Sequence, residues 1–226
     1  DRTIAVAPDE AFSYYQKAQT IMLWRIDFDE AQRILESGPG YSVDDERYVR
    51  FQTWLSNAAG RFDAAIDLLT RAPFDWYGQQ ASSIPRSLLL AEAWQMKGDP
   101  AEARPQYESA RVAIEQALVD RPDDYRLFSS LGVALAGLGR ADEAIAAGKR
   151  AIELMPVEKD AYIGPYFIGD LARTYTLLGM PDEALDQIDL LLSIPAKFSV
   201  ELLKVSPRWD SLRDHPRYQE ILEKNS

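Results

Sequence analysis

The sequence predicts an all-α fold, a right-handed superhelix of about five helix pairs that ends in a C-terminal capping helix. Two observations lead to this prediction. A motif in which alanine follows a small turn residue by five positions recurs along the chain, at steps of 34 to 41 residues. Between the copies, apolar residues recur at the three- and four-residue spacing of amphipathic helices.

The repeated motif gives the expected boundaries of the helix pairs. Its alanines are Ala31, Ala65, Ala103, Ala144 and Ala184; glycine precedes each of the last four by five positions, whereas the first copy has Ile26. Glycine readily adopts the left-handed conformation that ends a helix, and alanine lets a second helix approach closely. The pattern predicts a repeat array over 1–198 and a C-terminal cap over 199–226. The expected units lie near 9–38, 46–73, 85–122, 125–156 and 165–195.

The unit near 125–156 is the clearest. The apolar stripe of its first helix consists of Phe128, Leu131, Leu135 and Leu138. Gly139 supplies the left-handed position after this helix, and the second helix starts at Ala141 and ends before Pro156. Gly132 and Ala144 are small, so we expect the two helices to approach closely there.

This unit resembles the tetratricopeptide repeat (TPR) family, and a weaker resemblance covers nearly the whole chain. The residues that match the family pattern are Phe128, Leu131, Gly132, Leu135, Ala144, Ala151 and Pro156. Gly148 departs from the pattern, because a bulky residue is usual at its position. The resemblance implies stacked helix pairs and says little about the ligand.

The shortest distance between successive alanines of the motif is 34 residues, so longer distances require inserted residues within a unit. Apolar spacing continues after Ala110, which predicts a second helix about two turns longer than usual in the third unit. Residues 157–165 form either a longer loop or an extended start of the next helix. Residues 72–84 hold Phe74, Trp76 and Tyr77, which form either an exposed partner patch or a cluster packed under their own loop.

The composition argues against several classes of function. The 226 residues include 25 Lys and Arg against 36 Asp and Glu, for a net charge of −11. Nucleic acid is therefore not an expected partner, because its phosphates require clustered Lys and Arg. Cysteine is absent and His215 is the single histidine, which removes most metal-binding and nucleophilic chemistry. We expect no catalytic residue, no cofactor and no metal, and hence no enzyme.

The sequence also bears on location. No run approaches the roughly 18 apolar residues of a membrane span, so membrane insertion is not expected. The lack of cysteine fits either side of a bacterial inner membrane, with the cytoplasm slightly favoured. The oligomeric state stays open.

The candidate binding surface is the concave groove, which the resemblance assigns to the first helix of each unit. Positions that point away from the second helix are free to contact a ligand. The candidates are Lys17, Thr20, Trp24, Arg47, Arg50, Trp54, Asn57, Leu89, Glu92, Met96, Arg126, Ser129, Ser130, Val133, Tyr166, Asp170, Arg173 and Leu177. They combine aromatic rings, arginines and acids, which suits a peptide or helix bound in a groove.

These observations predict a non-enzymatic protein-interaction module that binds a peptide or protein segment in its groove. Residues 207–218 resemble the end of TPR segments in bacterial signalling proteins, where the array follows a Ser/Thr kinase, a nucleotide cyclase, a TolB-like domain or a winged-helix regulator. This resemblance implies a regulatory region of a larger protein. Two alternatives stay open: a sensor that binds a small ligand or signalling peptide, and a self-association module for attached output domains.

Overall fold

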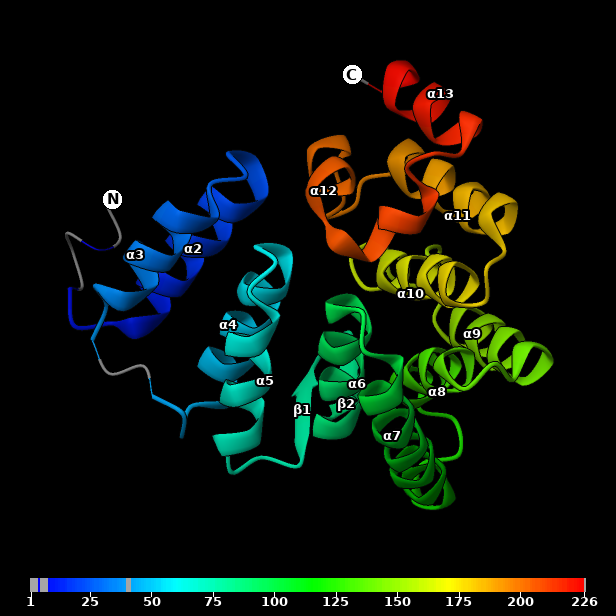
Figure 1. Cartoon of the computed structure of the whole chain (residues 1–226), viewed down its shortest axis with the longest axis horizontal. Coiled ribbons are helices and arrows are strands. Elements are labelled where there is room, and N and C mark those ends of the chain that lie inside the picture. Colours follow the sequence, from blue (N-terminus) through cyan, green and yellow to red (C-terminus); the bar gives the residue numbers. More distant parts are fainter. Residues whose placement is uncertain (1–3, 5–7, 40–41, 226) are drawn as a thin grey trace.

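The chain folds into five helix pairs that follow one another along an arc (Figure 1). The computed structural model describes residues 4, 8–39 and 42–225. The pairs are α2 (Ala11–Trp24) with α3 (Phe28–Glu36), α4 (Glu46–Ala58) with α5 (Phe62–Arg71), α6 (Arg86–Lys97) with α7 (Pro100–Asp120), α8 (Tyr125–Gly137) with α9 (Ala141–Leu154), and α10 (Gly164–Leu177) with α11 (Pro181–Ser193). The predicted all-α superhelix is confirmed. No helix among the described residues is long and apolar enough to cross a membrane.

The turns between paired helices have the predicted backbone conformation. The glycines of the motif have positive φ, and Gly139 after α8 has a φ of 79°. Glycine is favoured there because it has no Cβ to clash with the backbone. Ile26, which stands in the first copy, has a φ of 52° and is the one non-glycine residue with positive φ in the described part of the chain.

Small residues let α8 and α9 pack backbone against backbone. A Cβ on Gly132 would lie 3.0 Å from the carbonyl oxygen of Ala144 and 3.1 Å from the amide nitrogen of Gly148. The predicted close approach at Gly132 and Ala144 is therefore confirmed. Gly148 itself faces α10, where a Cβ would lie 2.9 Å from Cδ1 of Leu171. This contact explains why glycine occupies a position that is usually bulky.

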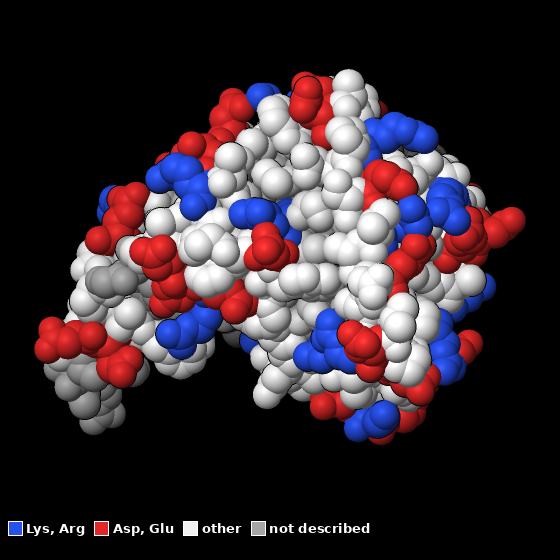
Figure 2. All heavy atoms as spheres, turned by 90° about the horizontal axis from the view of Figure 1, so that it is seen from below, with Lys and Arg blue, Asp and Glu red and all other residues white. Residues whose placement is uncertain are grey.

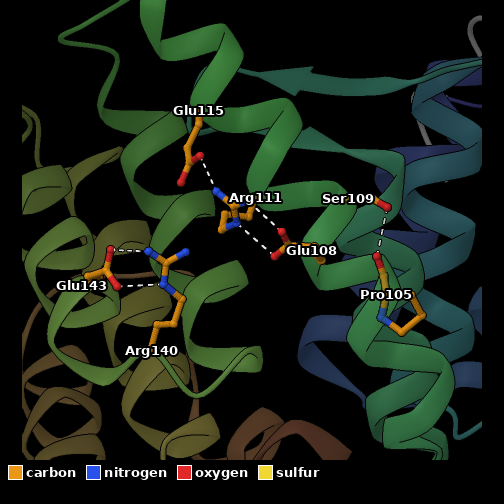
Figure 3. Close-up of polar contacts among 7 residues, drawn as sticks. All are labelled: Pro105, Glu108, Ser109, Arg111, Glu115, Arg140 and Glu143. Carbon is orange, nitrogen blue, oxygen red and sulfur yellow. Dashed lines mark hydrogen bonds and ion pairs between the residues drawn. The ribbon is translucent and has the colours of Figure 1, made fainter.

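The long second helix predicted for the third unit is α7, which has 21 residues against 14 in α9. Its exposed side carries local ion pairs (Figure 3): Arg111 lies 2.6 Å from Glu108 and also pairs with Glu115 one turn further on. Such pairs three and four residues apart favour the helical state. The second insertion forms a loop of turns over 157–163 before α10 begins.

The insertion after α5 folds into a hairpin of two short strands, β1 (Trp76–Gln79) and β2 (Ser82–Pro85), which the sequence analysis did not predict. The strands are antiparallel, with Tyr77 opposite Ile84. Tyr77 is fully buried, in a cluster with Phe74, Leu68 and Leu69. These aromatic residues therefore pack under their own segment, and the exposed-patch alternative is wrong for Tyr77.

The C-terminal residues form three short helices: α12 (Val200–Val205), the 3-10 helix η1 (Pro207–Leu212) and α13 (Pro216–Lys224). The last helix, α13, starts at Pro216 and buries Tyr218 and Ile221. It packs on α11, to which Lys224 is tied by a 2.8 Å ion pair with Asp189. In contrast, η1 packs on α10. The cap is thus more than an end helix, because part of it turns back along the array (Figure 1).

Candidate functional site

The first helices of the pairs and the C-terminal segment enclose a pocket of about 650 Å³. Its walls come from α2, α4, α6 and α10, with the hairpin residues 79–84 at one side. The segment 196–209, which contains α12 and the start of η1, supplies the remaining wall. A pocket of this size falls in the range that accommodates a small molecule or a short peptide.

Eight of the predicted groove residues line this pocket. They are Arg50, Trp54 and Asn57 from α4, Leu89 and Glu92 from α6, and Tyr166, Asp170 and Arg173 from α10. Met96 lines a small hollow next to it, together with Trp54, Asn57 and Arg208. The structure therefore brings together candidates from the second, third and fifth units.

The candidates of the fourth unit lie elsewhere, because the hairpin covers much of the exposed face of α8. Ser130 is buried, and its hydroxyl donates to the carbonyl of Ser83 on β2 at 2.9 Å. Val133 is 1% exposed. Ser129 is also buried, and its hydroxyl donates to Asp170 at 2.5 Å. Arg126 pairs with Asp124 at 2.8 Å and does not line the pocket.

The candidates of the first unit also lie outside the pocket. Lys17, Thr20 and Trp24 do not line the pocket, and Trp24 is 83% exposed. The residues of α2 that do line it are Phe12, Tyr15, Gln16, Gln19 and Leu23. The reason lies in packing, since Ala18, Ile21 and Met22 form the buried face of α2. The spacing of these apolar residues is visible in the sequence, and it identifies the buried face of α2 without the family pattern.

Two further candidates fall outside the pocket. Arg47 lies one turn before Arg50 on α4 and pairs with Asp45 at 3.6 Å, in a largely exposed position. Leu177 packs against the hydrophobic cluster built around α6, α7 and α8. Neither side chain is available to a ligand in the pocket.

The C-terminal wall of the pocket was not predicted from the sequence. Lys197, Arg208 and Trp209 line it, although the segment that carries them has no repeat periodicity. The sequence signal there was the break in the repeat, which indicated a cap at the end of the array. It did not indicate that the cap would fold back onto α10.

Four charged residues form a network at one end of the pocket, in which Glu92 and Arg173 are buried and Asp170 and Arg208 are half-buried. Glu92 of α6 pairs with Arg173 of α10 and lies 3.5 Å from Arg208 of η1. Asp170 lies 3.5 Å from Arg173. Burial lowers the pKa of both Arg173 and Arg208 and raises the pKa of Asp170, so each charge is costly unless it is paired. This network attaches η1 to α6 and α10.

The other end of the pocket holds cations among tyrosines. Arg50 of α4 donates to the Ser82 hydroxyl at 3.2 Å, and burial lowers its pKa. Lys197 donates to the hydroxyl of Tyr162 at 2.8 Å, and this hydrogen bond raises its pKa. Both cations interact electrostatically with Tyr166.

Among the buried side-chain oxygens of α4 that have no hydrogen-bond partner within the described part of the chain, two belong to pocket residues: Oγ1 of Thr53 and Oδ1 of Asn57. Both residues line the pocket, and they are 2% and 8% exposed. Buried polar groups are usually satisfied, so these two indicate where a ligand or water would bind. Within the same residues, no group of three His, Asp or Glu side chains has the arrangement of a metal site.

Comparisons with known proteins agree with this fold. The family model of the tetratricopeptide repeat matches 87–109 and 126–147, which fall in the third and fourth helix pairs. A thermophilic TPR protein from Thermus thermophilus has 21% sequence identity and a TM-score of 0.50; the match covers 95% of this chain and 100% of that one. No curated protein matches the sequence.

A second solved structure is a chain of the APC/C hetero-tetramer Cut9–Hcn1. The identity is 15% and the TM-score 0.53, and the match covers 98% of this chain but 44% of the other. The helix pairs, the glycines with positive φ and the two matched segments define a chain built from TPR-like repeats.

Proposed function

We propose that this chain is a non-enzymatic interaction module that binds a peptide or protein segment in the pocket on its concave side. The observation that supports this most is the meeting of groove positions from three helix pairs in one pocket of about 650 Å³. Stacked helix pairs hold such a surface in place before binding, so little ordering is required of the receptor.

The pocket offers contacts suited to a peptide. Trp54, Tyr15 and Phe12 supply apolar surface, while Thr53 and Asn57 supply polar groups for a ligand's backbone. Aromatic residues at a binding surface commonly contribute most of the binding free energy. We therefore assign the largest single contribution to Trp54, which is half-buried and contacts Phe51 at a ring separation of 5.9 Å.

The test is selection of peptides from a random library against the full chain, followed by calorimetry. Trp54→Ala should weaken the selected peptides about tenfold or more, as expected for an aromatic anchor. Trp24→Ala is the matched control, because Trp24 is exposed and outside the pocket. Equal losses in both variants, or a failure to select any peptide, would contradict the proposal.

A specific observation favours a second candidate, a sensor for a small ligand. The hairpin and the segment 196–209 add walls to the groove, and the resulting pocket of about 650 Å³ is of a size that suits a small ligand. Thermal-shift screening of small molecules, followed by small-angle scattering, distinguishes the two. A sensor should bind a small molecule and change its overall dimensions, which a passive peptide-binding module need not do.

We further propose that the chain is a regulatory region of a larger bacterial signalling protein. This rests on the resemblance of residues 207–218 to the end of such arrays. In this chain these residues form η1 and the start of α13, and they pack on α10 and α11. Sequencing the complete reading frame tests the proposal, since an output domain should be encoded in the same frame.

A further inference from the structure

Access to the pocket requires that part of its wall move. Thr53 lines the pocket but is only 2% exposed, and its hydroxyl has no hydrogen-bond partner among the described residues. A ligand can contact this hydroxyl only if neighbouring side chains or a wall segment give way. The outer surface offers no comparable feature on the face drawn in Figure 2, where acidic and basic side chains are interspersed and charge alone marks no binding site.

One wall of the pocket lies outside the helix pairs. The segment 194–199 joins α11 to α12 (Figure 1) and brings three side chains to the pocket: Ala196, Lys197 and Phe198. The sequence disfavours a helix here, because Pro195 lacks an N–H and restricts the residue before it. Ile194 is accordingly extended, with a φ of −120° and a ψ of 157°. This wall is therefore a connection without regular structure.

Few contacts hold the segment in place. Residues 194–198 form no backbone–backbone hydrogen bond with the described part of the chain, and none of residues 192–199 is buried. Lys197 donates to the hydroxyl of Tyr162 at 2.8 Å, and the ring of Phe198 packs edge-on against Trp209. A segment with little burial and unpaired backbone groups opens at a low free energy.

The parts on either side of the segment are held more firmly. Leu203 and Trp209, which follow it, are buried in the core formed with α10 and α11. The facing wall is the loop before α10, where the carboxylate of Asp160 accepts the backbone N–H groups of Tyr162 and Ile163 at 2.9 Å each. Movement at low cost is therefore confined to the segment between α11 and α12.

We infer that the segment 194–199 is a gate of the pocket. It opens about its two ends while α11 and α12 stay in place, and the hydrogen bond from Lys197 to Tyr162 holds it closed. Opening separates Phe198 from Trp209 and admits a ligand to the buried part of the pocket. The inference deepens the proposed function, and the role of the gate in binding rests on that function.

Spin labels can test the movement, because the chain has no cysteine and takes labels only where cysteine is introduced. Ala196→Cys paired with Lys149→Cys, at an exposed position of α9, reports the distance from the gate to the array by pulsed electron spin resonance on the full chain. Lys204→Cys, exposed on α12, replaces Ala196→Cys in the matched control pair. Tyr162→Phe should raise the fraction of long gate distances about fivefold, as expected for the loss of a hydrogen bond from a charged donor, and leave the α12 distances unchanged.

Two further variants make this result decisive. Tyr125→Phe removes a hydroxyl that donates to the carbonyl of Gln80 at 3.4 Å, and it should leave the gate distances unchanged. Lys197→Met removes the donor of the gate contact and serves if Tyr162→Phe fails to fold. Unchanged gate distances in both Tyr162→Phe and Lys197→Met overturn the inference. Equal changes in the gate and α12 distances also overturn it, because the segment would then move together with α12.

A second measurement tests whether opening admits molecules to the pocket. The Thr53→Cys thiol should react with N-ethylmaleimide about fivefold faster when Tyr162→Phe is added, in line with the larger open fraction. The Thr20→Cys thiol, exposed on α2 and outside the pocket, should keep its rate. An unchanged rate at position 53 overturns the gate. Neither measurement contains a ligand, so the proposed function is judged separately by the selection of peptides and can fail while the gate is confirmed.

Discussion

Arg208 of η1 lies 3.5 Å from Glu92 of α6, although 116 positions separate them in the sequence. Glu92 also pairs with Arg173 of α10, so one buried carboxylate serves two guanidinium groups. This carboxylate joins the C-terminal segment to the third and fifth helix pairs. The wall that the segment 196–209 adds to the pocket is therefore held by this acidic side chain in addition to the apolar packing of Leu203 and Trp209.

Replacing that carboxylate should be costly. Glu92→Gln removes the carboxylate that pairs with buried Arg173 and half-buried Arg208 and leaves Asp170 as the acid beside Arg173, and we expect a loss of about 3–5 kcal/mol in the free energy of unfolding. Chemical denaturation measures it. Glu108→Gln on α7 removes one partner of an exposed ion pair and should leave the denaturation midpoint nearly unchanged. Equal midpoints for both variants would show that the network carries no stability.

The two tryptophans at the ends of the chain should behave in opposite ways. Trp209 is buried, packs edge-on against Phe198 at 6.1 Å and belongs to the core formed with α10 and α11. Trp209→Ala should cost about 3–5 kcal/mol in unfolding free energy. Trp24→Ala should change it little, since Trp24 is exposed. Thermal melts followed by circular dichroism decide this, and a stable Trp209→Ala would place the C-terminal segment off the array.

Glycines inside helices should also differ in a predictable way. Gly132→Leu forces a side chain against the backbone of α9 and should lose roughly 1–3 kcal/mol by overpacking. Gly169→Ala in α10 meets only Leu191, at 3.7 Å, and should gain about 0.5–1 kcal/mol because alanine favours the helix. Urea unfolding measures both. A neutral Gly132→Leu would disprove the close contact between α8 and α9.

The hydroxyl of Tyr77 gives a prediction about pH. Burial raises the pKa of Tyr77 to about 12, and this hydroxyl has no hydrogen-bond partner among the described residues. The unfolded chain loses the proton near pH 10, so the folded state binds more protons between pH 10 and 12. Stability is thus fully present below pH 10 and falls as the pH rises toward 12.

Tyr77→Phe should therefore reduce the alkaline loss of stability and gain roughly 1 kcal/mol at pH 7, because an unsatisfied buried group is removed. Urea unfolding between pH 7 and 12 measures both effects. Tyr218→Phe is the counterpart, since the Tyr218 hydroxyl donates to the carbonyl of Leu203 at 3.0 Å and its removal should destabilise the fold. The opposite order at pH 7 would contradict the assignment.

Local spacing in the sequence predicts the helix pairs well. The apolar stripe around Leu131 and Leu135, the glycine at 139 and the small residue Gly132 each act within one pair, over a few turns of helix. Their effects do not depend on distant residues. The added length of α7 could be predicted for the same reason.

The pocket could be predicted only in part. Arg50 and Asp170 follow from helix register, but the burial of Ser130 depends on a hairpin inserted about 50 positions earlier, at Ser83. The positions of Lys197 and Arg208 depend on where the end of the chain folds back. The contact between Ser83 and Ser130 and the folding back of the C-terminal segment leave no periodic pattern in the sequence, because each joins segments from different units. The candidates on α2 lie outside the pocket for another reason, since Ala18, Ile21 and Met22 form the buried face of that helix.

The hairpin between α5 and α6 has a consequence for how the molecule unfolds. In arrays of stacked units, each unit touches its immediate neighbours, and opening can spread from either end in small steps. β2 contacts α6 of the third pair and also reaches α8 of the fourth pair, where Ser130 donates to the carbonyl of Ser83. Amide hydrogens of α4, α6 and α8 should therefore exchange with a common opening free energy, as one cooperative block in the centre of the chain.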